Sequence, residues 1–204
     1  MVNNLEQKGL LSAYQEVFRN QLEDRIIERI DVQPKDFDNY VWIPHRPVLK
    51  DEANVTTKIR PVFNCSLKTN NAPSLNEAAY AGINLMGDIV KLSLYFRSNE
   101  TVLLSDIKQA FLQIMLAKEE DRNRFCFFMK EGDDLITYRY RTIIFGFNAS
   151  PFILNYVIKH HASLFCDDEY SKILRSIFYV DNLNHLVFFS INVTISTLTL
   201  YWKQ

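Results

Sequence analysis

Two aspartates each close an apolar, strand-like run of the sequence, and they are its best candidates for chemistry. Asp106 ends the run in LLSDIKQAF, and Asp181 ends the run in FYVDN. A carboxylate at such a position needs a cation, a hydrogen-bond donor or solvent, because burying it unpaired is costly. Two carboxylates from neighbouring strands could hold Mg²⁺, which prefers oxygen ligands and brings substrate phosphates with it. Such a pair can serve two-metal phosphoryl chemistry.

Each aspartate also has a simpler interpretation, since a single acid at a strand end is more often a turn former or a strand cap. The sequence does not show that Asp106 and Asp181 meet in space, so both interpretations stay open at this point. Other acidic clusters are interpreted as solvated turns and helix ends: Glu119-Glu120-Asp121, Asp133-Asp134 and Asp167-Asp168-Glu169.

The remaining polar residues do not indicate a zinc site or a disulfide framework. The three cysteines, Cys65, Cys126 and Cys166, are odd in number and show no CxxC spacing, which fits a reducing compartment. His160 and His161 are adjacent on a predicted helix with no ligand spacing to another histidine or cysteine, so we interpret them as structural.

Composition predicts a folded protein without a strongly charged partner surface. The chain has 204 residues, 48% of them hydrophobic, and a formal net charge of -1. A dedicated nucleic-acid-binding domain is usually basic, so any nucleic-acid contact must come from local features. The N-terminal stretch MVNNLEQKGL has no apolar signal core, so we expect an intracellular, cytoplasmic location without secretion.

The first half of the chain is expected to hold amphipathic helices and a proline-containing hairpin. Apolar residues recur at helical spacing near the N-terminus, and Pro44 and Pro47 suit an edge strand or extended arm. The expected ranges are 10–30 for one or two helices, 32–39 for a connection, 41–49 and 59–65 for the hairpin strands, and 76–96 for a further helix.

The second half is expected to alternate strands with one long helix. The expected ranges are 101–107, 124–129 and 135–144 for strands, 150–164 for a helix, 176–180 for a strand, 181–182 for a turn and 185–189 for the returning strand. This order predicts an α+β layer, with an antiparallel sheet and helices on one face.

The last segment differs in character, because residues 186–202 carry no charged side chain. A buried or aggregation-prone strand is the favoured interpretation. A short transmembrane span is the alternative, although the length is marginal and several hydroxyl residues interrupt it. We expect no membrane association.

Four segments, in order, resemble the motifs of reverse transcriptases. SDIKQAFLQI is similar to their first catalytic motif, FGFNASPFILN to their second palm motif, and FYVDN to the YxDD hairpin that follows. Upstream, WIPHRPVLKDEANVTTKIRPVFNCS resembles the fingers hairpin that ends in K-x-R-x-V-F-D-x-S, and SLNEAAYAGINLMGDIVKLSLYFR resembles the segment between that hairpin and the first catalytic motif. The combination looks most like the Pao/BEL type of long-terminal-repeat retrotransposon, over roughly Leu11 to Leu183.

The resemblance implies an RNA-directed DNA polymerase, with Mg²⁺ or Mn²⁺ as cofactor and a primer–template and deoxynucleoside triphosphate as partners. It implies an α+β fold with fingers and a partial right-hand polymerase palm. The implied ranges are 1–40 for an N-terminal helical segment, 41–100 for fingers, 101–189 for the palm and 190–204 for an atypical tail.

The resemblance also assigns roles to individual residues. The implied catalytic residues are Asp106, Asp181 and Asn182, with Asp106 and Asp181 as metal ligands. The implied nucleotide-binding residues are Lys50, Lys58, Arg60, Ile107, Phe111, Phe145 and Gly146. The implied primer and template contacts are Ser150, Pro151, Tyr179 and Val180.

Most of these residues also have structural interpretations. Phe111 would be a gate that excludes a 2′-hydroxyl, but it could equally pack in a core. Gly146 would let backbone approach a ligand, or it could form a helix-entry turn with Ser150 as a cap. Tyr179 could be an ordinary core aromatic, and Arg60 a solvated hairpin residue.

Three departures weaken the expected activity. Asn182 stands where the family has a second acid, which removes one negative charge beside the metal ions. Asn64 replaces the acid of the fingers motif, and after Leu183 the resemblance stops without a thumb. We expect a frameshifted or decayed copy, and a catalytically inactive remnant that binds nucleic acid weakly is the alternative function. An unrelated α+β scaffold is the second alternative.

Overall fold

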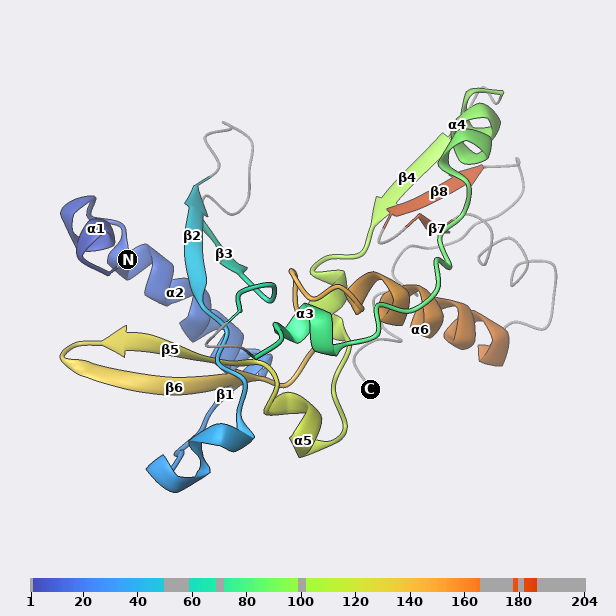
Figure 1. The fold of residues 1–204 in the computed structure, drawn as a ribbon. Helices are drawn as coiled ribbons and strands as arrows, with labels where there is room; N and C mark the ends of the chain where they lie inside the picture. Colours follow the sequence, from blue (N-terminus) through green and yellow to red (C-terminus); the bar gives the residue numbers. More distant parts are fainter. Residues whose placement is uncertain are drawn as a thin grey trace. The chain divides into compact units, whose positions relative to one another are not determined.

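The computed structural model describes residues 2–49, 59–68, 72–98, 102–165, 178–179 and 182–186. Within these residues the structure is mixed α+β with small antiparallel sheets (Figure 1), which confirms the predicted fold class at that level. The chain divides into two compact units. The first comprises Met1–Ala81 and Ile114–Ser150, and the second comprises Gly82–Gln113 and Pro151–Gln204.

The first unit contains short helices and two sheets. Its elements are α1 (Val2–Gln7), α2 (Leu11–Glu23), β1 (Ile27–Arg29), the 3-10 helix η1 (Pro34–Asn39), β2 (His45–Leu49), β3 (Ile59–Phe63), α3 (Leu75–Ala78), α5 (Glu119–Arg122), β5 (Cys126–Glu131) and β6 (Asp134–Tyr140). The described part of the second unit contains a sheet, two α-helices and a 3-10 helix. Its elements are α4 (Ile89–Arg97), β4 (Val102–Asp106), the 3-10 helix η2 (Ala110–Gln113), β7 (Phe178–Tyr179), β8 (Asn182–Leu186) and α6 (Ser150–Phe165), whose first residue belongs to the first unit.

Helix α2 ends at a residue with left-handed backbone, so the predicted helix over residues 10–30 is wrong beyond Glu23. Arg25 has φ of 58°, a conformation that non-glycine residues rarely adopt. The Ile26 N–H donates to the Gln21 carbonyl at 2.9 Å, and the Arg25 N–H to the Leu22 carbonyl at 3.1 Å. This pair of bonds is the Schellman motif, which satisfies the last helical carbonyls and redirects the chain into β1.

Strands β1, β6 and β5 form one sheet in that order. The β5–β6 hairpin turns at Gly132, whose φ is 61°. This confirms the two strands expected from the sequence and the turn that the residues Glu131-Gly132-Asp133 predict. The single sheet expected over residues 101–189 is not what forms. Strand β6 pairs with β1 along Ile27↔Tyr140, whereas β4 belongs to a different sheet.

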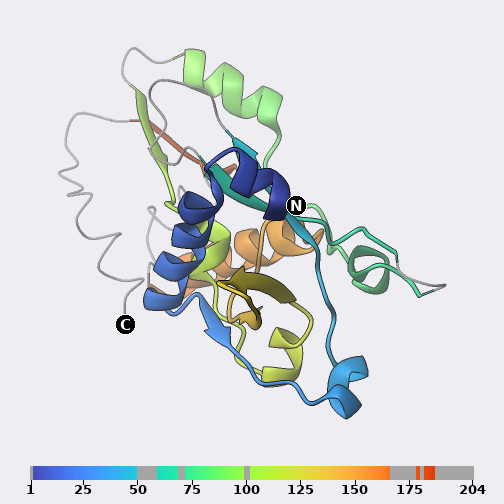
Figure 2. The same ribbon diagram turned by 90° about the vertical axis from the view of Figure 1, so that its left-hand side faces the viewer.

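The core of the first unit is a cluster of aromatic side chains around His45. Its ring centroid lies 5.3 Å from Phe18, Phe63 and Phe127, and 5.7 Å from Tyr14. Helix α2 lies beside β3 (Figure 1; Figure 2), and the Phe18 ring centroid lies 6.5 Å from that of Phe63. The edge-to-face and tilted contacts in this cluster are favourable arrangements for aromatic rings.

The two ring nitrogens of His45 are both hydrogen-bonded inside this core. Nε2 lies 2.9 Å from the Phe128 carbonyl, and Nδ1 lies 2.6 Å from the Tyr14 hydroxyl. Because a carbonyl only accepts, Nε2 carries the proton and Nδ1 accepts from Tyr14. Burial lowers the pKa of His45, and the bond to Phe128 opposes that effect only in part. The imidazole is therefore held neutral, joining α2, β2 and β5.

Strands β2 and β3 form a two-stranded ribbon, which confirms the predicted hairpin. Pro47 and Pro61 face each other in its register. The Asn64 N–H donates to the Pro44 carbonyl at 2.9 Å, so by alternation the Pro47↔Pro61 pair is a non-hydrogen-bonded one. The ribbon therefore loses no ladder hydrogen bond to either proline.

The helix predicted over residues 76–96 forms only at its two ends, as α3 and α4. A capping box starts α3, because Ser74 accepts from the Glu77 N–H and Glu77 accepts from the Ser74 N–H. Between the helices, Gly82 has φ of 84°, and a Cβ there would lie 2.1 Å from Cγ of Phe152. Asp88 caps α4 by accepting from the Val90 N–H at 2.9 Å.

In the second unit, β4, β8 and β7 form an antiparallel sheet, and α6 follows the predicted range closely. Lys159 on α6 donates to the Leu85 carbonyl at 2.6 Å, which fastens the segment before α4 to this helix. Strand β8 begins at Asn182, so that residue lies in a strand and not in the turn that we predicted. In the part of the chain that the structure describes, no helix combines the length and apolar character needed to cross a membrane. The tail over residues 190–204 lies outside that part.

Substitution of Arg25 tests how α2 ends. Arg25→Gly is expected to raise the free energy of unfolding by up to about 1 kcal/mol, because glycine adopts a positive φ without steric cost. Arg25→Val is expected to lower it by about 1 kcal/mol, since a β-branched side chain fits that conformation worst. Urea denaturation of both variants measures this, and equal effects would contradict the assigned backbone.

The stability of the protein is expected to fall as pH drops below about 6.5, the ordinary imidazole value. Because the pKa of His45 is lowered by folding, the unfolded chain binds a proton at His45 at a pH where the folded chain does not. The slope should approach about 1.4 kcal/mol per pH unit for one such group. Denaturation between pH 7 and 5.5 measures the slope, and His45→Gln should flatten the curve.

Candidate functional site

Asp106 stands directly opposite Asn182 in the β4–β8 ladder (Figure 1). Cross-strand partners in an antiparallel pair have Cα atoms about 4.5–5.5 Å apart. Asp106 is the last residue of β4, and its side chain is exposed. The first candidate acid therefore lies opposite the last residue of the FYVDN segment, which spacing alone did not establish.

The FYVDN segment is part of a hairpin whose strands are β7 and β8. Tyr179 pairs with Asn182, and the two residues between them are Val180 and Asp181. Val180 and Asp181 lie outside the described residues. Among those that are described, no group of three or more histidine, cysteine or acidic side chains could hold a metal ion. The metal pair predicted at Asp106 and Asp181 stays a prediction.

Immediately after Asp106 the backbone turns into η2. Gln109 has φ of 54°, and its carbonyl accepts from the Leu112 N–H at 2.8 Å. Ile107 is half-buried and Phe111 is buried, with 8% of its surface exposed. The burial of Phe111 fits the interpretation that it packs in a core. Its role as a gate against a 2′-hydroxyl remains an expectation from the resemblance.

Gly146 lies against the end of β3 in the first unit. Its φ is 98°, and a Cβ there would lie 2.6 Å from the Phe63 carbonyl oxygen. The close approach expected at Gly146 is thus to the protein's own backbone. Next to it, Phe145 is 48% exposed, which leaves part of its ring at the surface.

Two asparagines that sequence reasoning missed hold this loop. Asn76 donates to the Gly146 carbonyl at 3.0 Å, and its side-chain oxygen accepts from the Asn148 N–H at 2.9 Å. Asn148 donates back to the Asn76 carbonyl at 2.6 Å. The capping-box pattern from Ser74 to Glu77 could have indicated that Asn76 lies in the first turn of a short helix, but no local signal indicates its partner.

Ser150 and Pro151 form the start of α6. Ser150 is fully buried, and its hydroxyl donates to the Ile144 carbonyl at 2.7 Å. This bond fixes the entry into the helix, so Ser150 has a structural role that accounts for its position. Pro151 is half-buried in the first turn of α6, where its missing N–H is tolerated.

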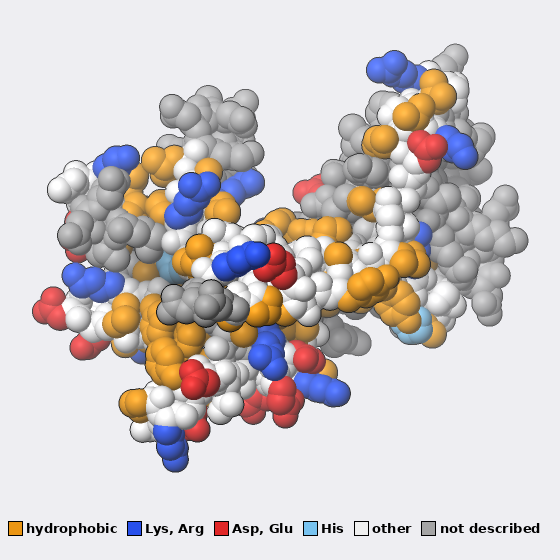
Figure 3. All heavy atoms as spheres, in the orientation of Figure 1, with side chains coloured by type: hydrophobic (Ala, Val, Ile, Leu, Met, Phe, Trp, Pro, Cys, Tyr) orange, Lys and Arg blue, Asp and Glu red, His pale blue; other side chains and the backbone are white. Residues whose placement is uncertain are grey.

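Arg60 is exposed on β3, and a second arginine shares its face of the ribbon. Val48 pairs with Arg60 and Arg46 pairs with Val62, and all four of these side chains are exposed. Lys50 and Lys58 lie outside the described residues. In the view of Figure 3, basic and acidic side chains are interspersed over the described surface. A phosphate at this ribbon would therefore be held by individual arginines and not by an extended basic surface.

The buried cysteines do not provide an alternative nucleophile. Burial raises the pKa of both Cys65 and Cys126 to about 12, and the nearby Arg139 only partly offsets this at Cys126. A thiol is a nucleophile as the thiolate, which these environments disfavour at neutral pH.

The predicted site residues fall in both units. Asp106, Ile107, Phe111, Pro151, Tyr179 and Asn182 belong to the second, and Arg60, Phe145, Gly146 and Ser150 to the first. The structure brings together Asp106 with Asn182, and Gly146 with the end of β3.

Comparison with known proteins gives no assignment, since no family model and no curated protein sequence matches the chain.

Replacing Gly146 tests its contact with Phe63. Gly146→Ala is expected to lower the free energy of unfolding by about 2 kcal/mol or more, because the new Cβ meets a backbone oxygen and φ is positive. Gly132→Ala is the matched control, since Gly132 also has a positive φ but has open space around it. The control should cost only about 1 kcal/mol. Equal losses in thermal or urea denaturation would show that the Phe63 contact contributes nothing.

Proposed function

We propose that this chain is part of a reverse transcriptase of the retrotransposon type, acting by metal-assisted nucleotidyl transfer. The register of β4 against β8 is the observation that carries the proposal. It sets Asp106, from the segment resembling the first catalytic motif, against the hairpin that resembles YxDD. Two motifs far apart in the chain thereby share one sheet, as a two-carboxylate site requires.

The chemistry of the donor set fits a hard divalent cation. Asp106 and Asp181 would hold Mg²⁺ or Mn²⁺ through carboxylate oxygens, with Asn182 adding at most a neutral amide oxygen. The Asp106 side chain is exposed, so a hydrated ion can reach it. The ion would neutralise charge on the incoming triphosphate and lower the pKa of the primer hydroxyl.

Other residues would bind and orient the substrates. Arg60, with Lys50 and Lys58, would contact the triphosphate of the deoxynucleotide, and the Ile107 backbone would border the phosphates. Phe145 and Gly146 would border the nucleotide, and Tyr179 and Val180 the primer end. The primer 3′-hydroxyl oxygen would form a bond to the α-phosphorus while the bond to the bridging oxygen breaks. Pyrophosphate would leave, and the hydroxyl proton would pass to solvent.

A catalytically inactive remnant is the second candidate, and Asn182 favours it. An amide at this position carries no charge, so the metal pair would face one carboxylate fewer than in the family pattern. Coulomb attraction between a dication and a carboxylate is among the largest local interactions in such a site. The remnant would keep the fold and bind nucleic acid weakly.

Primer extension on an RNA template separates the two candidates. The chain is compared with its Asn182→Asp variant, in Mg²⁺ and in Mn²⁺. Restoring the acid returns a negative charge beside the metal ions, so the rate of extension is expected to rise about tenfold or more. A tenfold rise corresponds to about 1.4 kcal/mol of transition-state stabilisation. Adding Asp106→Ala to the variant should abolish the signal.

Thermal unfolding with and without the metal gives a readout that does not need turnover. Mg²⁺ or Mn²⁺ should stabilise the chain and its Asn182→Asp variant, and Asp106→Ala should remove the effect. If no protein extends but the metal effect depends on Asp106, the remnant is supported. If no protein is stabilised and none extends, both candidates are wrong and an unrelated scaffold is left.

A further inference from the structure

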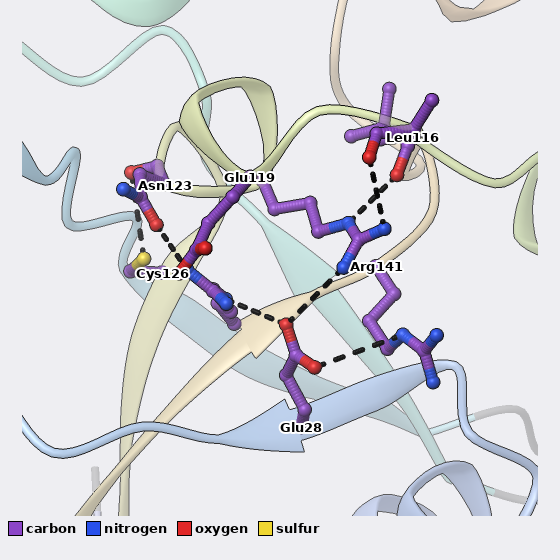
Figure 4. Close-up of polar contacts among 9 residues, drawn as sticks. Glu28, Leu116, Glu119, Asn123, Cys126 and Arg141 are labelled. Carbon is purple, nitrogen blue, oxygen red and sulfur yellow. Dashed lines mark hydrogen bonds and ion pairs between the residues drawn. The ribbon is translucent and has the colours of Figure 1, made fainter.

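Three arginines converge on one glutamate in the first unit (Figure 4). Glu28, on β1, accepts a hydrogen bond from Nε of Arg139 at 2.7 Å. Its carboxylate oxygens also lie 3.9 Å from Nη1 of Arg122 and 3.7 Å from Nε of Arg141. These last two are ion pairs that are too long to be hydrogen bonds.

The cluster carries more positive than negative charge. Among the described residues, the one other acid in the cluster is Glu119 on α5, which lies 2.9 Å from Arg139. Three guanidinium groups therefore face two carboxylates among the described residues, and the Glu119 side chain is 68% exposed. Solvent screens that exposed carboxylate, so it offsets the excess charge only weakly.

Arg139 and Arg122 are committed to partners within the protein. Arg139 is buried; burial alone would lower its pKa, but the hydrogen bonds to Glu28 and Glu119 outweigh this and raise it. Arg122 donates to the Leu116 carbonyl at 2.7 Å and to the Ala117 carbonyl at 3.2 Å. Both guanidinium groups are thus fixed in place.

Arg141 differs from the other two, because its guanidinium has no hydrogen bond to any described residue. Its Nε is buried without a hydrogen-bond partner, 3.7 Å from Glu28. The side chain as a whole is 28% exposed. Figure 4 shows the outer two nitrogens of Arg141 pointing away from Glu28. The backbone of Arg141 is held between Ile26 and Leu116, so its position is set by the sheet.

We propose that Arg141 is the anion-binding residue of a site that takes up a phosphate group beside the Glu28 cluster. The planar fork of an arginine matches two phosphate oxygens and forms charge-assisted bonds with both. The bound anion balances the excess charge of the cluster and gives the Arg141 guanidinium, which has an ion pair but no hydrogen bond, its acceptors. The residues of this site all belong to the first unit, and the site goes beyond the proposed polymerase function.

A purely structural role for the cluster is the competing explanation, and Glu28 separates the two. If Glu28 only ties β1 to β6, its loss weakens the fold equally in any buffer. If the cluster is an anion site, Glu28→Gln leaves three guanidinium groups without their central carboxylate. That variant should be unstable in chloride and should gain more stability from phosphate than the unaltered chain does.

The experiment titrates the full chain with inorganic phosphate at constant ionic strength, using chloride as the reference. Calorimetry measures affinity, and thermal unfolding measures stabilisation. Phosphate is expected to bind and to raise Tm, and Arg141→Gln is expected to weaken binding about tenfold, as for the loss of one charge-assisted pair. Arg29→Gln is the matched control: it removes an arginine of β1 that is already paired with Glu131 and Tyr138, and binding should persist.

The proposal is overturned if phosphate does not bind the unaltered chain, or if Arg141→Gln and Arg29→Gln have the same effect on binding. Glu28→Gln that is equally unstable in chloride and phosphate would also overturn it. Competition by a single-stranded oligonucleotide then identifies the source of the phosphate. Displacement indicates a nucleic-acid phosphodiester and no displacement a free or mononucleotide phosphate, and both results keep the site. None of these measurements depends on polymerase activity or on Asp106.

Discussion

A neutral imidazole inside an aromatic core is the constraint on which the first unit depends. His45 is half-buried, and both of its polar nitrogens are hydrogen-bonded within the protein. The Tyr14 hydroxyl and the Phe128 carbonyl satisfy them, which fixes helix α2, the β2–β3 ribbon and strand β5 against one another. The end of β3 then meets Gly146, and the loop that carries Phe145 is held by Asn76 and Asn148. The half-buried His45 ring thus packs the elements against which the loop with Phe145 and Gly146 lies.

The second unit depends instead on a backbone register. A shift of one residue between β4 and β8 would move Asp106 away from Asn182 and reverse the faces of all the strand side chains. The short η2 segment, with Phe111 and its neighbours buried, anchors the chain just beyond Asp106. The exposed acid is therefore attached to a buried support, which suits a group that must contact a ligand with fixed geometry.

Much of the local structure follows from pattern in the sequence. Alternation and turn residues predicted the β5–β6 hairpin and the proline-containing ribbon, and apolar spacing predicted α6. The failures arise where tertiary contacts decide. The apolar residues Ile26 and Ile27 continue a helical pattern, but Arg25 adopts a left-handed conformation and β1 pairs with β6. Similarly, Gly82 lies against Phe152, a residue far away in the sequence, and the predicted helix is broken there.

The candidate site shows the same division. Sequence alone identified Asp106 and Asp181 as candidates, because each acid closes an apolar run, and Asn182 was identified only through the resemblance to the YxDD hairpin. It could not show the pairing of Asp106 with Asn182, which requires strand register. Nor could it find Arg141, which is notable because its buried Nε has no hydrogen-bond partner, or Glu28, which is distant in the chain from the arginines around it. Roles that depend on unpaired atoms become visible only once every neighbour is known.

The paired prolines of the β2–β3 ribbon limit pairing of its edges with strands of other molecules. Pro47 and Pro61 form a non-hydrogen-bonded pair, so their nitrogens face outward, one on each edge of the ribbon. An incoming strand needs N–H donors along the edge that it joins, and the central donor is absent on both sides. A two-stranded ribbon with exposed valines would otherwise be a template for intermolecular β-pairing. The prolines protect it against aggregation without weakening the ribbon itself.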